Sequence, residues 1–495
     1  MRRARYKAGR STPSLGCCSL LGGVYPALER GSEGKDGKVG VGTSMVSTLG
    51  TRSGLACSGV VEGWRVLLLR SSVEMKTLVV TVLAGAAYAN AQTSNTTSPL
   101  VESCGPSSAI ACVKKYASVL PYPFYRLTGV NGSYEDTFPS TTVPNDTSFG
   151  LISQADFVVF DKERGLEILG SNPSYEFMFA VNDAVHEAPV YVPATNKLYF
   201  SQLRGDTSPP GYLPQRVINL NVDPPELGEL ISDPPIYAPN GGTYHNGLIY
   251  WGVSGGNTSI GGIEQRPGIA TLDPLTNKTE TLLNNYFGYY FNTIDDLFVD
   301  ERGDVWFTDP HYSWFNALTE TAPQLETASY RFRPSTGQVS IVDDSLAQPN
   351  GIAISPALAN STTRTVYISD TGAVSGPIAQ ELGPQGATFN STGKRIIYAF
   401  DRTTNGNHLI NKRPIYLAQD WLPDGLKVAA NGYIVTGAGK GVDVLNPDGA
   451  LLLRIQTNYT VQNFAWTGKE LKTLWLMGNN GVSKVEWDLK GQELV

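Results

Sequence analysis

The sequence lacks an excess of positive charge, and this absence removes one broad class of function. Its 495 residues carry 38 Lys and Arg against 45 Asp and Glu, which gives a formal net charge of −7 at pH 7. No cluster of Lys and Arg interrupts this balance, so we expect no nucleic-acid partner. The P-loop motif G-x-x-x-x-G-K-[ST] is missing. The Gly-rich stretch at Gly255 and Gly256 is expected to form a hairpin loop, not a strand-to-helix nucleophile elbow.

Cysteine and histidine are also scarce, which limits thiolate and imidazole chemistry. There are five Cys and four His. Cys17, Cys18 and Cys57 precede a candidate secretory signal, so Cys104 and Cys112 remain as an even pair. In an oxidising compartment such a pair predicts a local disulfide, and no Cys is left to act as a nucleophile.

A candidate secretory signal lies at residues 75–91. Lys76 supplies the positive end, an apolar stretch follows, and Ala89-Asn90-Ala91 matches an A-x-A cleavage site before Gln92. The apolar stretch is too short to span a bilayer, so stable membrane insertion is not expected. Residues 1–74 are interpreted as an extension outside the mature protein, with a disordered tail before a signal anchor as the alternative.

Glycosylation sequons agree with secretion. Asn-x-Ser/Thr occurs at eight positions, namely Asn95, Asn131, Asn145, Asn257, Asn277, Asn360, Asn390 and Asn458. A secreted chain would carry glycans at several of them. We therefore expect an extracellular glycoprotein.

A short motif recurs six times: an acidic or amide residue, an apolar run, a turn and a second strand-like run. The copies begin at Glu187, Asn240, Asp295, Asn350, Asp424 and Asn463, and successive starts lie 39 to 74 residues apart. This period is typical of propeller blades. We therefore predict an all-β, six-bladed β-propeller over residues 151–495, with a central channel that six polar side chains would ring.

Other segments fit around this array. Residues 92–150 are rich in Ser, Thr, Pro and Asn and predict an extended arm, with a short helix near residues 109–116. The alternating run at residues 155–160 predicts a strand that closes the ring as the outer strand of the last blade. The Gly- and Pro-rich stretch at residues 372–393 predicts a long loop that covers one face and shapes a site entrance.

Glu187, Asn350 and Asp424 form the sharpest constellation among the repeat starts. Two carboxylates and one amide oxygen facing one axis suit a hard divalent cation, and Ca²⁺ is preferred, with Zn²⁺ or Mg²⁺ as alternatives. Asn and Asp also begin strands after turns in any β protein, so these residues alone leave a purely structural role open.

Four stretches in order carry a resemblance to a known family. HEAPVYVPATNKLYF, DDLFVDERGDVWFTDPHY, QPNGIAIS followed by VYISDTG, and PDGLKVAANGYIVTGAGKGVDVLNPDG resemble the senescence-marker-protein/gluconolactonase family, and within it the secreted fungal lactonohydrolases. The resemblance implies a six-bladed propeller that binds a divalent cation at its axis and hydrolyses small-molecule lactones.

By that similarity the metal ligands of the family fall on Glu187, Asn350 and Asp424. The family's Asn-Asp pair on the third blade matches Asp295-Asp296, so this chain departs from the pattern at Asp295. Asp295 becomes a candidate fourth ligand or substrate contact. Asn292, three residues upstream, could take over the substrate contact. At the start of the second repeat, Asn240 is a further substrate-binding candidate.

The expected chemistry is hydrolysis of an ester bond by an activated water. Asp424 is the candidate general base, and a purely ligating role for it stays open. His311, which follows a strand end, is the alternative proton carrier, whereas His186 is expected to be a hydrogen-bonded loop residue. The alternative functions are an arylesterase or organophosphate hydrolase on the same fold, and a non-catalytic ligand-binding propeller. The sequence leaves the oligomeric state open.

Overall fold

The computed structural model describes residues 99–114, 119–121, 123–126, 138–203, 213–357 and 363–494. The expected signal and the segment before it lie outside the described residues, and so do the sequons at Asn95, Asn131 and Asn360. In the described part of the chain, no helix is long and apolar enough to cross a membrane.

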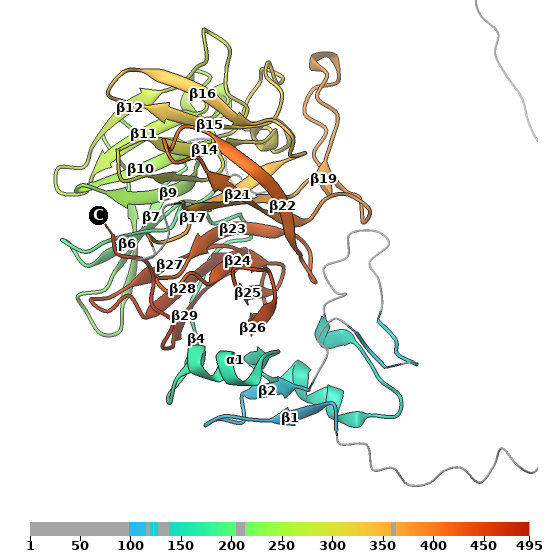
Figure 1. The fold of residues 1–495 in the computed structure, drawn as a ribbon. Coiled ribbons are helices and arrows are strands. Elements are labelled where there is room, and N and C mark those ends of the chain that lie inside the picture. The colour runs from blue at the N-terminus through green and yellow to red at the C-terminus, as the bar shows by residue number, and fades with distance from the viewer. Residues whose placement is uncertain are drawn as a thin grey trace, which may run out of the picture. The chain divides into compact units, whose positions relative to one another are not determined.

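The fold is an all-β propeller, which confirms the predicted class (Figure 1). Three four-stranded antiparallel sheets follow one another in the chain. Their strands are β5 (Val190–Val192), β6 (Lys197–Phe200), β7 (Gln215–Asn219) and β8 (Glu226–Leu230); β9 (Pro239–His245), β10 (Leu248–Val253), β11 (Gly268–Asp273) and β12 (Lys278–Leu283); and β13 (Leu297–Val299), β14 (Val305–Asp309), β15 (Ala328–Arg333) and β16 (Gln338–Asp343).

Two further four-stranded sheets complete a set of five. One contains β17 (Pro349–Ile354), β18 (Thr365–Asp370), β21 (Ile396–Arg402) and β22 (Leu409–Leu417), and the other contains β27 (Val461–Thr467), β28 (Thr473–Gly478), β29 (Gly481–Glu486) and β4 (Ser174–Ala180). The prediction of six blades therefore needs a correction, because the described residues form five four-stranded blades and the remaining repeat belongs to a larger sheet.

That larger sheet has seven strands. Its order is β1 (Val101–Ser103), β2 (Ile110–Val113), β3 (Phe157–Val159), β26 (Leu451–Gln456), β25 (Gly441–Leu445), β24 (Ile434–Ala438) and β23 (Pro423–Val428). The four strands from β23 to β26 repeat the antiparallel pattern of the other sheets. β3, together with β1 and β2 of the N-terminal arm, extends this sheet at its outer edge.

A few short elements connect the sheets. The helices are α1 (Lys162–Leu169), α2 (Thr258–Gly261) and α3 (Tyr312–Phe315), and the 3₁₀ turns are η1 (Phe138–Ser140), η2 (Thr147–Gln154) and η3 (Gln380–Leu382). A two-stranded hairpin of β19 (Val374–Ser375) and β20 (Thr388–Phe389) lies within the long insertion between β18 and β21.

The position of each strand in its sheet follows its sequence. β17 is buried along its whole length, whereas β8 and β12 at outer edges alternate between exposed and half-buried residues. Strands buried on both faces read as continuous apolar runs, and edge strands carry charge. The innermost strands β5, β9, β13, β17, β23 and β27 each contact the next, and β27 contacts β5.

The ring closes through a different strand from the one predicted. β4 pairs antiparallel with β29 and completes the last sheet, whereas β3, the predicted closing strand, pairs with β26. β3 is wholly buried because β26 and the parallel strand β2 flank it. Four exposed residues on β4 suit an outer edge. Alternation of apolar residues therefore identified a strand but not its partner.

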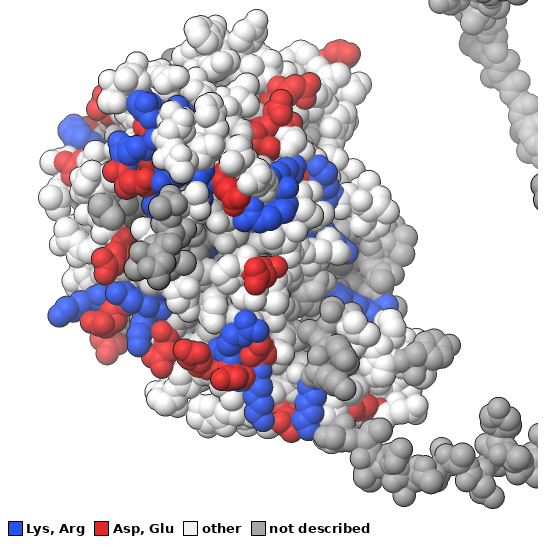
Figure 2. All heavy atoms as spheres, in the orientation of Figure 1, with Lys and Arg blue, Asp and Glu red and all other residues white. Residues whose placement is uncertain are grey.

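The N-terminal arm is more ordered than its composition predicted. Cys104 and Cys112 form the predicted disulfide, with their Cα atoms 5.8 Å apart. Ile110 to Val113 form a strand and not the predicted helix, because β1 and β3 flank this segment and it is entirely buried. On the face shown in Figure 2, acidic and basic side chains intermingle without a large patch of one sign.

Candidate functional site

A cavity of about 500 Å³ opens at one end of the innermost strands. Five of the six repeat starts line it, namely Glu187, Asn240, Asp295, Asn350 and Asp424. Each comes from a different sheet, and each lies at the start of an innermost strand or shortly before it. The repeat pattern therefore placed these residues together across 237 positions of the chain, counted from residue 187 to residue 424.

Small residues allow the innermost strands to approach one another here. A Cβ atom on Gly351 would lie 2.5 Å from the backbone oxygen of Asp424, and one on Gly241 would lie 2.4 Å from that of Asp295. Side chains at these positions would push neighbouring strands apart. The glycine after the polar repeat start is therefore needed for close approach around the axis.

The six repeat starts form three acid–amide pairs. Asn463 donates from Nδ2 to Glu187 Oε2 at 2.9 Å, and Asn240 donates from Nδ2 to Asp295 Oδ1 at 2.8 Å. Asp424 accepts a side-chain hydrogen bond from Asn350. We refer to these contacts as the axial acid–amide pairs. Asn463 was not predicted as a site residue, although its place at the start of the sixth repeat was the available signal.

Burial and nearby negative charges raise the pKa of all three acids. Burial raises the pKa of Glu187 well above its ordinary value, and the charges of Asp424 and Asp295 add to this effect. Burial, followed by the charges of Asp424 and Asp296, does the same for the pKa of Asp295. Burial also raises the pKa of Asp424 to about 7, although the hydrogen bond from Asn350 opposes this. Clustered carboxylates with raised pKa values are typical of functional sites.

Asp296 does not line the cavity, although it is adjacent to Asp295. Its carboxylate accepts a hydrogen bond from the Leu297 backbone N–H at 2.9 Å. Burial raises its pKa to about 6, while the positive charge of Lys427 lowers it. Asp296 therefore lies between the cavity and the other end of the inner strands.

The oxygen atoms of the axial acid–amide pairs are of the type that a hard divalent cation prefers as ligands. The pairs offer carboxylate and amide oxygens, and within the described part of the chain Asp295 Oδ2 is buried without a hydrogen-bond partner. A cation would offset the repulsion that raises the acid pKa values. Within the described residues, no three His, Cys, Asp or Glu side chains lie close enough together to form a complete metal site. Amide oxygens would have to complete the ligand set.

Two predicted site residues have other partners. Asn292 is buried and donates from Nδ2 to Asp309 Oδ2 at 3.1 Å. His311 Nε2 lies 3.4 Å from the Leu325 carbonyl oxygen, and burial lowers its pKa. The residues that line the axial cavity do not include either of them. Both side chains stabilise the loops around β14, and the predicted roles of Asn292 as a substrate contact and of His311 as a proton carrier stay predictions.

Tyr312, next to His311, lines the cavity and was missed by the sequence reasoning. Its hydroxyl lies 2.5 Å from Thr371 Oγ1. Burial raises the pKa of Tyr312, and the charges of Asp295 and Asp424 raise it further, so the phenol is a neutral hydrogen-bonding group near the acids. The one-turn helix α3 turns this residue, and not His311, toward the axis.

The remaining histidine and serine candidates are structural. His186 Nδ1 lies 3.0 Å from the Gly478 carbonyl oxygen, and burial lowers its pKa to about 4. The stretch around Gly255 lies in the connection between the antiparallel strands β10 and β11, which confirms the predicted hairpin loop, and the short helix α2 lies within the same connection. Ser254 there is fully buried, and its Oγ has no hydrogen-bond partner among the described residues. This arrangement gives Ser254 no base that could activate it.

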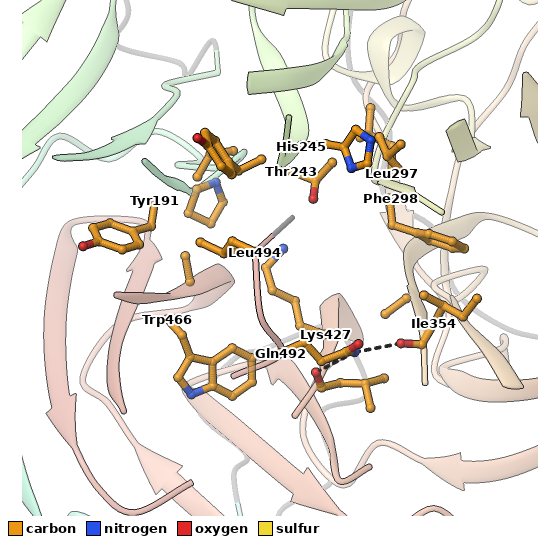
Figure 3. Close-up of a pocket in the computed structure, with 18 of the residues that line it drawn as sticks. Tyr191, Thr243, His245, Leu297, Phe298, Ile354, Lys427, Trp466, Gln492 and Leu494 are labelled. Atoms are coloured by element: carbon orange, nitrogen blue, oxygen red, sulfur yellow. Dashed lines mark hydrogen bonds between the residues drawn. The ribbon is translucent and has the colours of Figure 1, made fainter. Parts of the chain in front are cut away.

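The opposite end of the inner strands holds a separate pocket of about 190 Å³. Figure 3 shows Lys427, His245 and Trp466 around it, with Leu494 of the C-terminal segment at its centre. Gln492 donates from Nε2 to the carbonyl oxygens of Ile354 and Val428, at 2.8 Å and 3.0 Å. The C-terminal segment therefore covers this end, and the axial cavity opens at the other.

Comparison with known proteins identifies relatives over most of the chain. Residues 382–478 match the model of the SMP-30/Gluconolactonase/LRE-like region. Lactonohydrolase oryL of Aspergillus oryzae is 47% identical over 79% of this chain and 88% of its own, and lactonohydrolase oryH of the same organism is 40% identical over 82% and 96%.

The fold has relatives among solved structures as well. A gluconolactonase from Xanthomonas campestris superposes with a TM-score of 0.51 at 23% identity, over 66% of this chain and 93% of its own. This likeness concerns the fold, whereas the sequence identity to the fungal proteins establishes descent. The chain therefore belongs to the SMP-30/gluconolactonase family.

Proposed function

We propose that the protein is a secreted, metal-dependent lactonase that opens the ring of a sugar-acid or related lactone. The observation that carries this proposal is the set of axial acid–amide pairs, which lines a cavity in a chain 47% identical to a fungal lactonohydrolase. A non-catalytic propeller would gain nothing from three buried acids with raised pKa values, because their burial lowers stability.

The residues that would hold the cation are Glu187, Asn350 and Asp424, with Asp295 as a fourth candidate. Ca²⁺ is the preferred ion because all the donors are oxygens, and Zn²⁺ or Mg²⁺ are the alternatives. The chemistry supplied by the cation when bound is polarisation of the lactone carbonyl and stabilisation of the developing oxyanion.

The chain itself would handle the proton. Asp424 accepts a proton from a water in the cavity while that water's oxygen attacks the carbonyl carbon. The ring C–O bond then breaks, and the proton passes from Asp424 to the departing ring oxygen, which leaves a hydroxy acid. Asn350 orients the Asp424 carboxylate through their hydrogen bond.

Asn240 and Asp295 are the proposed substrate contacts. Both line the cavity, and their mutual hydrogen bond fixes the orientation of each side chain. Tyr312 is a third contact candidate because its hydroxyl can accept a hydrogen bond from a substrate hydroxyl. His311 is the reserve proton carrier if Asp424 proves to be a ligand alone.

We also propose a six-bladed architecture in which β23 to β26 act as the sixth blade. Their antiparallel order and the contacts of β23 with β17 and β27 support this count. Secretion is supported by the disulfide and by the exposed sequons Asn145, Asn390 and Asn458. Residues 75–91 would be the signal, and glycans would occupy several sequons.

The test is hydrolysis of a panel of sugar lactones, simple lactones and aryl esters by the purified protein, with and without chelator. We expect lactones to be hydrolysed, chelator to abolish the activity, and Ca²⁺ to restore it. Preferential hydrolysis of aryl or phosphate esters would favour the arylesterase alternative instead. Lactonase activity that is unchanged by exhaustive chelation would rule out metal dependence.

A further inference from the structure

One wall of the axial cavity is apolar and comes from two segments outside the repeats. Val374 and Ala387 belong to the insertion between β18 and β21, and Trp421 and Leu422 belong to the loop before β23. We call these four residues the apolar wall. The axial acid–amide pairs and the apolar wall give the cavity one polar end and one apolar side.

The insertion is held in place by bonds to neighbouring segments. Trp314 Nε1 donates to the Pro377 carbonyl oxygen at 3.0 Å, and the Ala322 backbone N–H donates to Gln380 Oε1 at 2.7 Å. Val374 pairs with Phe389 in the β19–β20 hairpin. The wall is therefore preorganised by the fold.

Trp421 is held in an unusual conformation. Its backbone φ is 44°, in the left-handed region that bulky residues rarely adopt. Its ring stacks on Phe389 with the ring centroids 4.6 Å apart and an interplanar angle of 18°. A conformation that the backbone alone disfavours persists when surrounding contacts determine it, and such residues cluster at ligand sites.

Hydrogen bonds hold the two residues that precede Trp421 in its loop. Arg126 donates from Nη2 to the Gln419 carbonyl oxygen at 2.6 Å. The Asp420 carboxylate accepts hydrogen bonds from Arg454 Nη2 at 2.8 Å and from the Lys440 backbone N–H at 3.1 Å. These contacts fix the two residues that precede Trp421, and the stack with Phe389 holds its ring, so Trp421 has a defined place in the cavity.

We propose that the apolar wall selects lactones that carry an apolar substituent on the ring over polyhydroxylated sugar lactones. This inference rests on the proposed lactonase function. A lactone whose carbonyl points to the acid–amide pairs would place its ring substituent against the wall. Hydroxyl groups in that position would lose hydrogen bonds to water without gaining partners, whereas an alkyl or aryl group gains contact.

The test measures binding and hydrolysis separately. Three lactams that cannot be opened in the assay, δ-valerolactam, its 6-pentyl derivative and the lactam of gluconic acid, are titrated by calorimetry into the Ca²⁺-loaded protein. Hydrolysis of the corresponding lactones is measured in parallel. We expect the pentyl lactam to bind at least roughly tenfold more tightly than the other two, and the pentyl lactone to have the highest kcat/KM.

Two variants and one control assign the preference to the wall. The quantity compared is the ratio of the binding constants of the pentyl lactam and the lactam of gluconic acid. Trp421→Ala should bring this ratio close to one. Val374→Thr, a near-isosteric change that adds a hydroxyl, should lower it several-fold. The control is Phe287→Ala, because Phe287 is also an aromatic residue with positive φ, at 50°, but is 89% exposed and does not line the cavity. It should leave the ratio unchanged.

The possible outcomes distinguish a failure of the inference from a failure of the proposed lactonase function. Hydrolysis of the three lactones without a preference for the pentyl compound would overturn the inference and leave the lactonase function intact. A binding preference that is lost in Trp421→Ala, without hydrolysis of any lactone, would support the wall and overturn the lactonase function. If the protein neither binds the lactams nor hydrolyses the lactones, both the inference and the lactonase function are overturned. If Trp421→Ala does not fold, an unchanged ratio in Val374→Thr overturns the inference by itself.

Discussion

Removing the charge of Asp424 should change how the stability of the metal-free protein depends on pH. The pKa of this carboxyl is about 7 in the folded protein and ordinarily 3.8. The folded protein therefore keeps a proton on Asp424 between about pH 4 and pH 7, where the unfolded chain has lost it. Stability contributed by this group is greatest below pH 4, falls as the pH rises through this window, and is constant above pH 7.

The magnitude follows from the same pKa values. Between pH 5 and pH 8 the integrated change is about 3 kcal/mol, because one pH unit corresponds to about 1.4 kcal/mol for one proton. Asp424 is half-buried and faces the cavity. Water in the cavity stabilises the charged form and reduces the change, so we expect about 2 kcal/mol.

The assay compares Asp424→Asn with the unaltered protein in urea at pH 5 and pH 8, with chelator throughout. From pH 5 to pH 8, the free energy of unfolding of the variant should rise by about 2 kcal/mol relative to that of the unaltered protein. The buried His186, whose pKa is lowered to about 4, has the opposite pH dependence, but it is common to both proteins and cancels. A stability difference that does not change with pH would refute the reasoning. With excess Ca²⁺ the unaltered protein should be the more stable of the two, because the intact carboxylate then binds the cation.

Three other predictions concern activity, processing and the arm. If Asp424 is the base, Asp424→Asn should lower lactonase kcat by roughly 10²–10⁴-fold, and excess Ca²⁺ should not restore the activity. Asp295→Asn should keep substantial activity and weaken cation binding. Full restoration of the activity of both variants by Ca²⁺ would make Asp424 a ligand alone. N-terminal sequencing of secreted protein should begin at Gln92, and glycosidase should lower its mass; residues from before position 75 would contradict this. Cys104→Ser should lower stability by about 2–3 kcal/mol in urea, with kcat unchanged because Cys112 and its partner lie outside the cavity; an unaltered urea midpoint would refute it.

The axis of the propeller was predictable because each repeat carries its own local signal. A polar residue before an apolar run marks where an innermost strand begins, and this holds whether or not the neighbouring repeat is known. The structure places five of these repeat starts on one cavity. Their glycines reinforce the signal, since Gly241 and Gly351 lie where a neighbouring backbone approaches closely.

The partners of the outer strands were not predictable in the same way. β3 and β4 are both rich in apolar residues, and pairing depends on which edge each one reaches in space. The wrong assignment of residues 110–113 as a helix has a similar cause, because the flanking strands that bury this segment are distant in sequence or were not recognised. Side-chain direction was a third gap. His311 and Tyr312 are adjacent, and only the turn of α3 decides which faces the cavity.

The pairing of acids with amides explains why this site can carry three carboxylates. Each acid uses one oxygen to accept from an amide, as Glu187 does from Asn463 and Asp295 does from Asn240. At Asp295 the second oxygen has no hydrogen-bond partner among the residues that the structure describes. Without a cation, burial and the negative charge of Asp296 keep the pKa of Asp424 at about 7. A divalent charge would lower that pKa and leave Asp424 ionised and able to take a proton from water. On this argument the extra carboxylate at Asp295 strengthens cation binding and makes the basicity of Asp424 depend on the bound ion.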